Sequence, residues 1–342
     1  MGKDLLQVKD LKVYFSKKSG FLKKKQDEIR AVDKVTLSLK AGETLGIVGE
    51  SGCGKSTLAR TIMGLEKPTS GTVLFEGQDI FSLNRKQMHQ LRRDIQMVFQ
   101  DPFSSLNPRM KVGDIIAAPL KAYGYPNKGI RKKVSELMDL VGIKPEYYDR
   151  LPHEFSGGQC QRIGIARAIA LKPKLIVCDE PVSALDVSIQ AQIINLLKDL
   201  QKEFHLTYLF ISHDLSVVKN IANRVAVIYL GKVVEFAENE SFFNQPFHPY
   251  THMLLSAIPL PDPRAEKARN RIAIKNDFPV NAGSASRGCV FYSRCPIAQD
   301  YCREHVPEFV NITADHRAAC FYPVKNNSVV GEAPSDPRTS VK

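Results

Sequence analysis

Apolar and polar residues alternate at the start of the chain, and short apolar runs follow further along. Leu6, Val8, Leu11, Val13 and Phe15 are apolar among polar neighbours, which predicts a strand over 5–15. The same reasoning predicts a strand at 31–39 and a hairpin of two strands around the turn at 230–231. Short apolar runs predict buried strands at 45–48, 71–75, 95–99, 174–181 and 206–211.

Helical spacing of apolar residues lies between several of these strands. Leu58, Ile62 and Leu65 recur at i, i+4 and i+7 after the run at 45–48, as in a helix packed on a sheet. Further helices are predicted at 87–93, 112–123, 130–141, 160–170 and 189–204. Strands that alternate with helices predict an α/β fold, with a largely parallel sheet and helices on both of its faces.

The helix and strand pattern weakens after about residue 256. Prolines at positions 259, 261 and 263 open a stretch of mixed charge, which predicts a linker before a small tail that carries cysteines. We therefore expect three parts: a main domain over 1–258 with a helical insert at about 101–165, a linker and C-terminal extension over 259–325, and a disordered tail over 326–342.

The segment 49–56 is Gly-Glu-Ser-Gly-Cys-Gly-Lys-Ser, which matches the phosphate-binding loop G-x-x-x-x-G-K-S. It lies between a predicted strand and a predicted helix, where backbone N–H groups and a helix N-terminus attract phosphate. We expect Lys55 to reach the β- and γ-phosphates and the Ser56 hydroxyl to ligate Mg²⁺. The residues expected to contact the nucleotide are Gly49, Glu50, Ser51, Gly52, Cys53, Gly54, Lys55, Ser56 and Thr57.

A pair of acids ends the apolar run at 174–181. Asp179 can bind Mg²⁺ through water, and Glu180 can polarise the water that attacks the γ-phosphate. An apolar run that ends in Asp-Glu is common and often only ends a strand. Its position downstream of a phosphate loop is what favours a catalytic role.

The segment Phe155-Ser-Gly-Gly-Gln159 resembles the L-S-G-G-Q signature of ABC-type ATPases. The resemblance implies that Ser156, Gly157, Gly158 and Gln159 contact the γ-phosphate held by a second subunit, so that two subunits enclose two ATP molecules. Phe155 in place of Leu, and Cys160 in place of Gln after the signature, are departures that do not touch the phosphate contacts.

Other residues match the same family in order along the chain. Gln100 resembles the Q-loop glutamine, which reaches Mg²⁺ or the water, and His213 resembles the switch histidine, which contacts the γ-phosphate. Asp186 ends a segment that resembles the D-loop at the subunit interface. Phe15 falls where the family stacks an aromatic ring on adenine, and Tyr14 is the alternative. The implied fold is a P-loop ABC ATPase cassette with a RecA-like core, an antiparallel β-subdomain, a helical insert and a small cysteine-rich C-terminal extension.

Four segments are similar to the ATP-binding subunits of oligopeptide and dipeptide importers: 98–108, 182–192, 248–259 and 288–296. The sequences of 98–108 and 182–192 are similar to those of the F-type subunit, the second of the two paired ATPases. The resemblance implies ATP-powered peptide import, with a sister ATPase in a heterodimer, two membrane permeases and an extracytoplasmic substrate-binding protein. It places the chain at the cytoplasmic face of the cell membrane as a peripheral subunit. Nickel, metallophore and antimicrobial-peptide transporters share this ATPase type and remain alternatives.

The formal net charge of +12 suits nucleic acid, an anionic membrane surface or acidic partners, and a soluble ABC ATPase of DNA repair or translation is therefore a rival. The resemblance implies no nucleic-acid partner, because one unbroken cassette is not typical of those proteins. A non-catalytic cassette is disfavoured by Glu180 and His213, and a small-molecule kinase by the signature. No apolar run approaches about 20 residues and no secretory signal is apparent, so we expect a protein of the cytosol.

Four of the seven cysteines lie in the C-terminal extension, at Cys289, Cys295, Cys302 and Cys320. Zinc modules bring ligands in close C-x-x-C pairs, and this spacing does not, whereas irregularly spaced thiolates suit an iron–sulfur cluster. The importer family's C-terminal extension is associated with a 4Fe–4S cluster, so the resemblance implies one here. The tail is too short and polar to bury much core by itself, which a metal would offset. Zinc and free thiols remain alternatives.

Overall fold

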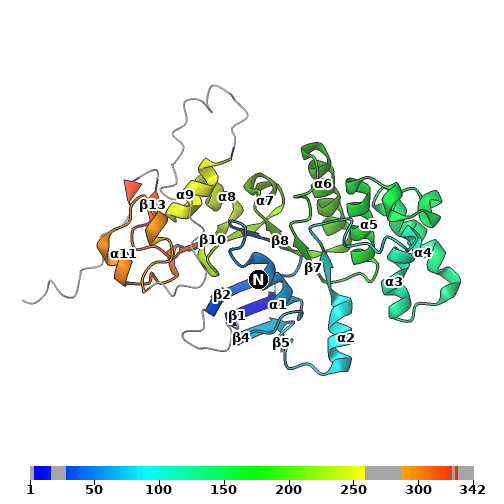
Figure 1. Ribbon diagram of the computed structural model, residues 1–342, viewed down its shortest axis with the longest axis horizontal. Coiled ribbons are helices and arrows are strands. Elements are labelled where there is room, and N and C mark those ends of the chain that lie inside the picture. The colour runs from blue at the N-terminus through cyan, green and yellow to red at the C-terminus, as the bar shows by residue number, and fades with distance from the viewer. Residues whose placement is uncertain (1–3, 17–27, 259–286, 326–327, 330–342) are drawn as a thin grey trace, which may run out of the picture.

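Two β-sheets form the centre of the protein in the computed structural model, which describes residues 4–16, 28–258, 287–325 and 328–329 (Figure 1). The larger sheet has eight strands in the order β11-β12-β10-β9-β3-β8-β7-β6, and the smaller has four in the order β2-β1-β4-β5. The strands are β1 (Asp4–Ser16), β2 (Glu28–Lys40), β3 (Thr44–Val48), β4 (Ser70–Phe75), β5 (Gln78–Asp79), β6 (Ile95–Val98), β7 (Leu175–Asp179), β8 (Thr207–Ser212), β9 (Arg224–Tyr229), β10 (Lys232–Glu238), β11 (Val310–Thr313) and β12 (His316–Ala318), with a separate short pair of β13 (Val324–Lys325) and β14 (Ser328–Val329).

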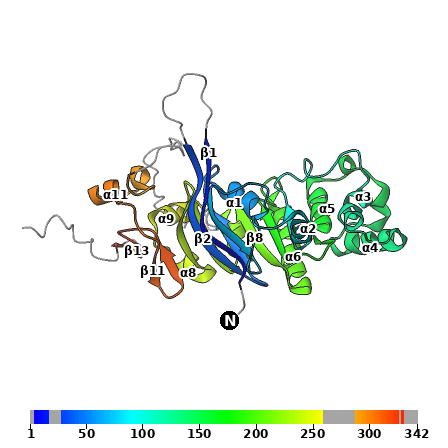
Figure 2. The ribbon, with the colours of Figure 1, turned by 90° about the horizontal axis from the view of Figure 1, so that it is seen from below.

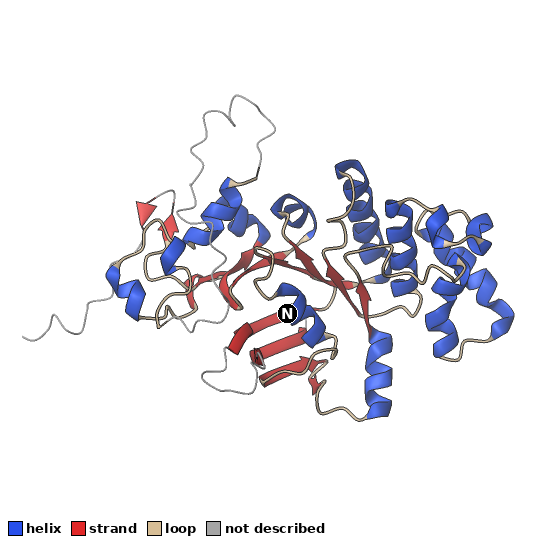
Figure 3. Cartoon of the chain, viewed as in Figure 1, coloured by secondary structure: helices blue, strands red, loops and turns tan. Residues whose placement is uncertain are grey.

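Helices flank the larger sheet and extend beyond one of its edges (Figure 3). They are α1 (Lys55–Ile62), α2 (Arg85–Asp94), α3 (Val112–Ala122), α4 (Asn127–Leu140), α5 (Gly157–Ile169), α6 (Val187–Phe204), α7 (Leu215–Ile221), α8 (Asn239–Asn244), α9 (Pro249–Ser256) and α11 (Asp300–Glu304), with 3-10 turns η1 (Pro145–Asp149), η2 (Pro152–Glu154) and η3 (Tyr292–Arg294). None of the helices that the structure describes has the length and apolar character needed to span a bilayer.

Five neighbouring strands of the larger sheet run parallel, from β9 through β3, β8 and β7 to β6. Every residue of β3, β7 and β8 is buried, as expected for parallel strands with both faces covered. Strand β10 then turns back antiparallel to β9. The α/β fold with a largely parallel sheet, predicted from the apolar runs, is confirmed.

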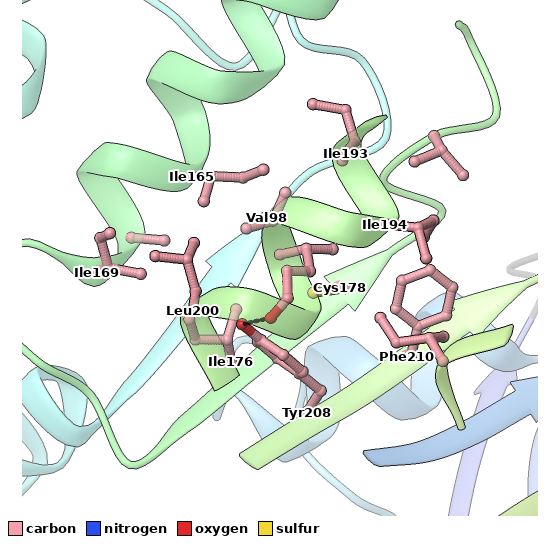
Figure 4. Packing of buried hydrophobic residues seen from close by; sticks show 14 of the residues in the cluster. Val98, Ile165, Ile169, Ile176, Cys178, Ile193, Ile194, Leu200, Tyr208 and Phe210 are labelled. Atoms are coloured by element: carbon pink, nitrogen blue, oxygen red, sulfur yellow. Dashed lines mark hydrogen bonds between the residues drawn. The ribbon is translucent and has the colours of Figure 1, made fainter. Parts of the chain in front are cut away.

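The larger sheet has a hydrophobic core on each face. On one face, Leu58 and Ile62 of α1 lie in a cluster with Ile47 of the larger sheet and Val8 of the antiparallel sheet, which Figure 2 shows beside it. On the other face α5 and α6 pack on β7 and β8, as Figure 4 shows for Ile165, Ile193 and Tyr208. The Tyr208 hydroxyl, buried in this cluster, donates to the Leu197 carbonyl oxygen at 3.0 Å. Helix α1, which begins in the phosphate loop, is thus fixed between the two sheets.

The helical insert lies at one end of the molecule and the C-terminal residues lie at the other (Figure 1). Helices α3 and α4 form the outer part of the insert and pack against α5. Helix α5 runs without a break from Gly157 to Ile169, so the boundary expected near residue 165 falls inside a continuous helix. The insert and the larger sheet therefore share one rigid element, whose first residues belong to the signature segment.

The C-terminal residues join the larger sheet. Strand β12 pairs antiparallel with β10, and β11 pairs with β12. Phe291 is buried against Tyr229 and Tyr250, which gives this segment an apolar anchor in the main core. The expected division at residue 258 stays a prediction, and the described residues on its two sides are in contact. The expected linker at 259–286 and nearly all of the expected tail at 326–342 lie outside the described residues.

Candidate nucleotide site

The phosphate loop connects β3 to α1 and depends on glycine at two tightly enclosed positions. Gly54 has φ +107°, and a Cβ there would lie 2.0 Å from the Ala31 carbonyl oxygen. Gly49 has φ +153°, and its Cβ would lie 2.2 Å from the Ile228 carbonyl oxygen. Side chains are therefore excluded by both backbone conformation and space. The loop is pressed against the strands β2 and β9 that pass beside it.

A cavity of about 640 Å³ opens over this loop. It is lined by the whole predicted loop, by the three predicted residues Gln100, Glu180 and His213, and by six residues from other segments. The lining residues are Ile29, Arg30, Ala31, Gly49, Glu50, Ser51, Gly52, Cys53, Gly54, Lys55, Ser56, Thr57, Gln100, Glu180, His213, Leu230, Gly231 and Leu254. Residues far apart in the sequence thus face one volume that suits a small polyanionic ligand.

Lys55 is held at the centre of the loop. Its Nζ donates to the carbonyl oxygens of Gly49 at 2.8 Å and Glu50 at 2.9 Å, and only 4% of its side chain is exposed. The same ammonium lies 4.0 Å from Oε1 of Glu180. A buried cation beside a row of backbone N–H groups attracts phosphate oxygens.

Glu180 stands at the meeting point of three strand ends. Its Oε2 lies 3.1 Å from Gln100 Nε2, which follows β6, and 3.0 Å from His213 Nδ1, which follows β8. Glu180 itself follows β7. The three residues meet because the carboxyl ends of parallel strands lie at one edge of a sheet. The φ of Glu180, 49°, is left-handed, and its N–H donates to the Ile211 carbonyl oxygen at 2.9 Å. The carboxylate is thus fixed close to the phosphate loop, where it can accept a proton from a water molecule.

Asp179 and Ser56 form the candidate magnesium site. Ser56 Oγ donates to Asp179 Oδ1 at 3.1 Å. Burial raises the pKa of Asp179; the Ser56 hydrogen bond opposes that rise and the nearby Glu180 charge adds to it. A hydroxyl and a carboxylate are the oxygen ligands that Mg²⁺ accepts. The two residues would therefore hold the ion between the loop and β7, and its charge would offset that of the buried carboxylate.

Phe15 and Tyr14 face different surroundings. Phe15 is 38% exposed and pairs across the strands with Ile29, which lines the nucleotide cavity. Tyr14 instead donates its hydroxyl hydrogen to Asp33 Oδ1 at 2.6 Å, and burial raises its pKa to about 12. Tyr14 pairs in the same way with Arg30, which also lines the cavity, and neither Phe15 nor Tyr14 is part of the described lining. Phe15 as the residue that stacks on adenine stays a prediction.

The signature residues lie outside this cavity. Ser156 caps α5: its Oγ accepts from the Gln159 N–H at 3.3 Å, and Gln159 Oε1 accepts from the Ser156 N–H at 3.0 Å. Gly157 and Gly158 are the first two residues of that helix, and a Cβ on Gly158 would meet Ile189 of α6 at 2.5 Å. Asp186 precedes α6 and is likewise absent from the described cavity lining. One chain therefore does not bring its own signature to its own phosphate loop.

Some residues of the site were missed by sequence reasoning. Tyr250 accepts a hydrogen bond from the Glu50 N–H at 3.0 Å, and Arg294 pairs with the Glu50 carboxylate. The Gly231 N–H donates to the Cys53 carbonyl oxygen at 2.8 Å, so the β9–β10 turn braces the loop. Only that turn had a sequence signal, in Leu230-Gly231. Tyr250 and Arg294 lie some 200 positions or more from the loop. They belong to the importer-like segments 248–259 and 288–296, but that resemblance does not indicate a contact with the loop.

The four cysteines of the C-terminal extension line one small cavity, together with Phe291 and Tyr322 among others. None of the four forms a disulfide bond. Burial raises the pKa of Cys289, that of Cys295 to about 11 and that of Cys320 to about 12. Within the described residues, no three His, Cys, Asp or Glu side chains are arranged to hold a metal ion. The structure thus gathers the cysteines without forming a site for a single ion.

Comparison with known proteins identifies relatives along nearly the whole chain. Residues 32–183 match the family described as ABC transporter, and residues 234–302 match the oligopeptide/dipeptide transporter C-terminal region. The oligopeptide transport ATP-binding protein AppF of Bacillus subtilis is 52% identical over 92% of this chain and 96% of its own length. OppF of Escherichia coli is also 52% identical, over 89% and 92%. The di/tripeptide transport ATP-binding protein DppF of Pseudomonas aeruginosa is 47% identical, over 93% and 97%.

Solved structures show the same fold. The cbiO1 structure from Clostridium perfringens superposes with a TM-score of 0.61 at 30% identity, covering 70% of this chain and 90% of that one. The dimeric cassette MJ0796, in a post-hydrolysis state with ADP and Pi, superposes with a TM-score of 0.60 at 30% identity, covering 68% and 98%. With the phosphate loop, the signature and these relatives in agreement, the chain is an ABC ATPase that belongs to the family of oligopeptide transport ATP-binding proteins.

Proposed function

We propose that this protein hydrolyses ATP to power peptide import across the cell membrane, as a peripheral subunit on the cytoplasmic side. The observation that carries the peptide assignment is 52% identity over 92% of the chain to a protein named for oligopeptide transport. The C-terminal match to the oligopeptide/dipeptide transporter family supports the same cargo. Transport of nickel, a metallophore or an antimicrobial peptide by the same ATPase type is the alternative.

The geometry of the cavity supports a direct hydrolysis of MgATP. Lys55 and the loop N–H groups would bind the β- and γ-phosphates, Ser56 and Asp179 would hold Mg²⁺, and Phe15 would stack on adenine. Glu180 would accept a hydrogen bond from water as the water oxygen attacks the γ-phosphorus. The bond to the β–γ bridging oxygen breaks, the electrons stay on ADP, and the water proton passes through Glu180 to the products. Gln100 and His213 keep the carboxylate in place.

The proposed assembly is a heterodimer with a sister ATPase. Ser156 to Gln159 lie away from the chain's own loop, so each signature would close over nucleotide held by the other subunit. ATP then stabilises the closed pair because its phosphates contact both subunits, and hydrolysis removes those contacts. The insert, with α3 and α4, would contact one of two membrane permeases. Gln100 at its root would relay closure to them, and an extracytoplasmic protein would deliver the peptide.

Isolation of the complex from native membranes tests this proposal. We expect two permeases and a second ATPase to copurify with the tagged chain, and deletion of its gene to abolish uptake of a labelled tripeptide. Uptake of a labelled nickel complex or of an antimicrobial peptide, measured in the same cells, is the control for the other cargoes. Loss of nickel uptake with normal tripeptide uptake would overturn the peptide assignment.

We further propose that Cys289, Cys295, Cys302 and Cys320 hold a 4Fe–4S cluster. Four thiols that line one cavity fit the ligand number of such a cluster. The spacing of the four cysteines lacks the close C-x-x-C pairs of zinc modules, and zinc and free thiols are the alternatives. A bound cluster would tie together the loops of the C-terminal segment and has no step in ATP hydrolysis to perform.

Anaerobic purification of the full chain tests the cluster. We expect brown protein with roughly four irons per chain, as four thiolate ligands imply. Cys295→Ser should lower the iron content, whereas Cys160→Ser, which changes a buried cysteine outside the tail, should not. Colourless protein with stoichiometric zinc, or unchanged iron in Cys295→Ser, would contradict the proposal.

A further inference from the structure

The phosphate loop makes an ion pair with the C-terminal segment. Arg294 Nη1 donates to Glu50 Oε2 at 2.7 Å, and Nη2 donates to Glu50 Oε1 at 2.8 Å. This two-point geometry is the strongest form of arginine–carboxylate pairing. The Arg294 side chain is 10% exposed and that of Glu50 is 40% exposed, so the contact lies at the rim of the nucleotide cavity. Arg294 of the C-terminal segment thus binds the side chain of Glu50, the second residue of the phosphate loop.

Arg294 is held in place by its own surroundings. It ends the turn η3, and Phe291 just before that turn is 1% exposed. The Phe291 ring packs against Tyr229 at 5.2 Å and Tyr250 at 5.4 Å, measured between ring centroids. The guanidinium carbon lies 5.8 Å from the centre of the Tyr229 ring. The arginine is therefore presented to the loop by a packed aromatic cluster, which lowers the entropy lost when it pairs.

Glu50 connects this arginine to Lys55. The Glu50 carbonyl oxygen accepts from Lys55 Nζ at 2.9 Å, and its N–H donates to the Tyr250 hydroxyl at 3.0 Å. Arg294 fixes the carboxylate of the same residue. One loop residue is thus held through its side chain, its N–H and its carbonyl, and two of these three contacts come from the segment after β10. The Lys55 ammonium is bonded to the carbonyl oxygen of this same residue and to that of Gly49.

The ion pair also sets the charge of the cavity. Glu50 lines the cavity beside the groups that would bind the phosphates. An unpaired carboxylate there repels a polyanion, and a paired one does not. The hydrogen bond to Glu50 is the main cause that raises the pKa of Arg294, and it outweighs the opposing effect of burial, so the arginine stays charged.

We propose that Arg294 is a positioning residue for ATP: by pairing with Glu50 it orders the phosphate loop around Lys55 and neutralises the one acid of that loop, so the C-terminal segment is part of the nucleotide site. The inference concerns ATP binding, which the family already establishes, and holds whatever the cargo. It assigns to the segment a role that does not require a metal at the cysteines.

Equilibrium binding of MgATP to the purified full chain tests the proposal. We expect Arg294→Gln to weaken binding about three- to tenfold, the range for a partly exposed but two-point ion pair. Arg294→Lys keeps the charge and loses the fork, so it should fall between that variant and wild type. In the assembled complex the KM for ATP should rise with kcat nearly unchanged, as when binding shared by ground and transition states is lost.

A double-mutant cycle separates this role from a merely structural one. In a Glu50→Gln background, Arg294→Gln should change ATP affinity less than twofold, because its partner is already gone. Arg303→Gln changes an exposed arginine of the same segment and should match wild type. Iron and zinc are measured in every variant, since Arg294 precedes Cys295.

Two results would overturn the inference. One is wild-type ATP affinity in Arg294→Gln. The other is an equal loss of affinity from Arg294→Gln with and without the Glu50 carboxylate, which would place its effect outside the loop. If Arg294→Gln proves unstable to heat, Glu50→Gln alone, which changes no residue of the C-terminal segment, must still weaken binding or the inference fails.

Discussion

Glu180 carries the largest share of the chemistry expected of a single residue. It adopts φ 49°, a region that non-glycine residues occupy at a cost, and three contacts keep it there: its N–H to Ile211 and its carboxylate to Gln100 and His213. The strain and the contacts together aim one carboxylate at the phosphate loop. A substitution that keeps the shape of this side chain should therefore disturb the local structure less than one that changes its shape.

Glu180→Gln should therefore bind MgATP normally but hydrolyse it at least about a hundredfold more slowly, because an amide cannot accept the water proton. Turnover is measured in the assembled complex and nucleotide affinity on the purified chain. Glu203→Gln, an exposed glutamate of α6, is the matched control and should behave as wild type. Near-normal turnover in Glu180→Gln would remove Glu180 from the mechanism.

Two glycines of the phosphate loop separate the steric cost of adding a Cβ from the cost of a left-handed backbone conformation. Both Gly52 and Gly54 have positive φ, but a Cβ on Gly52 meets nothing within 4 Å while one on Gly54 lies 2.0 Å from Ala31. Gly52→Ala should cost about 1 kcal/mol of stability from its left-handed backbone alone. Gly54→Ala should cost at least about 2 kcal/mol more, since the chain must also shift. Denaturant unfolding of both variants measures this, and equal losses would refute the steric argument.

At this scale the sequence predicts residues whose chemistry is local. Lys55, Ser56 and the glycines sit in one short motif, and Glu180 ends an apolar strand, so spacing alone places them. Arg294 and Tyr250 reach Glu50 only after the chain has folded back, and nothing near them in the sequence marks that contact. Long-range pairing is a property of the fold, not of a motif.

Among the elements, β10 has an unusual role, because a fully buried glutamate in it fastens the C-terminal strand. Glu235 is 0% exposed; its Oε1 accepts from His316 Nε2 at 2.6 Å and the Phe247 N–H at 2.7 Å, and its Oε2 from the His248 N–H at 2.9 Å. His316 belongs to β12 and also contacts Ser241. One carboxylate thus accepts three hydrogen bonds from two segments, β12 and residues 247–248.

Glu235→Gln should lower the free energy of unfolding by about 3 kcal/mol, because the amide leaves buried donors unpaired. Denaturant unfolding measures the loss. Glu238→Gln, at the exposed end of the same strand, is the control and should change stability by less than about 0.5 kcal/mol. A small loss in Glu235→Gln would mean that the backbone pairing of β10 with β12 suffices.

Most elements could be predicted from the sequence to within a few residues, since their apolar runs or helical spacing of apolar residues stand out from the neighbouring residues. Strand β7 was expected at 174–181 and spans Leu175–Asp179, and the helix expected at 189–204 begins two residues earlier, at Val187. Strands β11 and β12 were not predicted. They have four and three residues, too few for a periodic pattern, and β12 pairs with a strand far away in the sequence.

For the whole molecule, the decisive fact is that the signature and the phosphate loop of one chain lie apart. Ser156→Arg should therefore leave MgATP binding at Lys55 intact and impair hydrolysis of nucleotide held by the sister subunit. Single-turnover assays in complexes with one inactivated site measure this. The isolated chain should hydrolyse ATP much more slowly than the complex. Equal rates for chain and complex would show that each site is complete in one subunit.

The pairing of β10 with β12 also has a consequence for synthesis. His316 follows Glu238 by 78 positions, so a ribosome that adds about 5–20 residues per second needs on the order of ten seconds to supply the missing strand. Until then the outer edge of β10 presents free backbone donors and acceptors and an unpaired Glu235 to other newly made chains. The nascent protein is open to mispairing along this edge until β12 has been synthesised and pairs with β10.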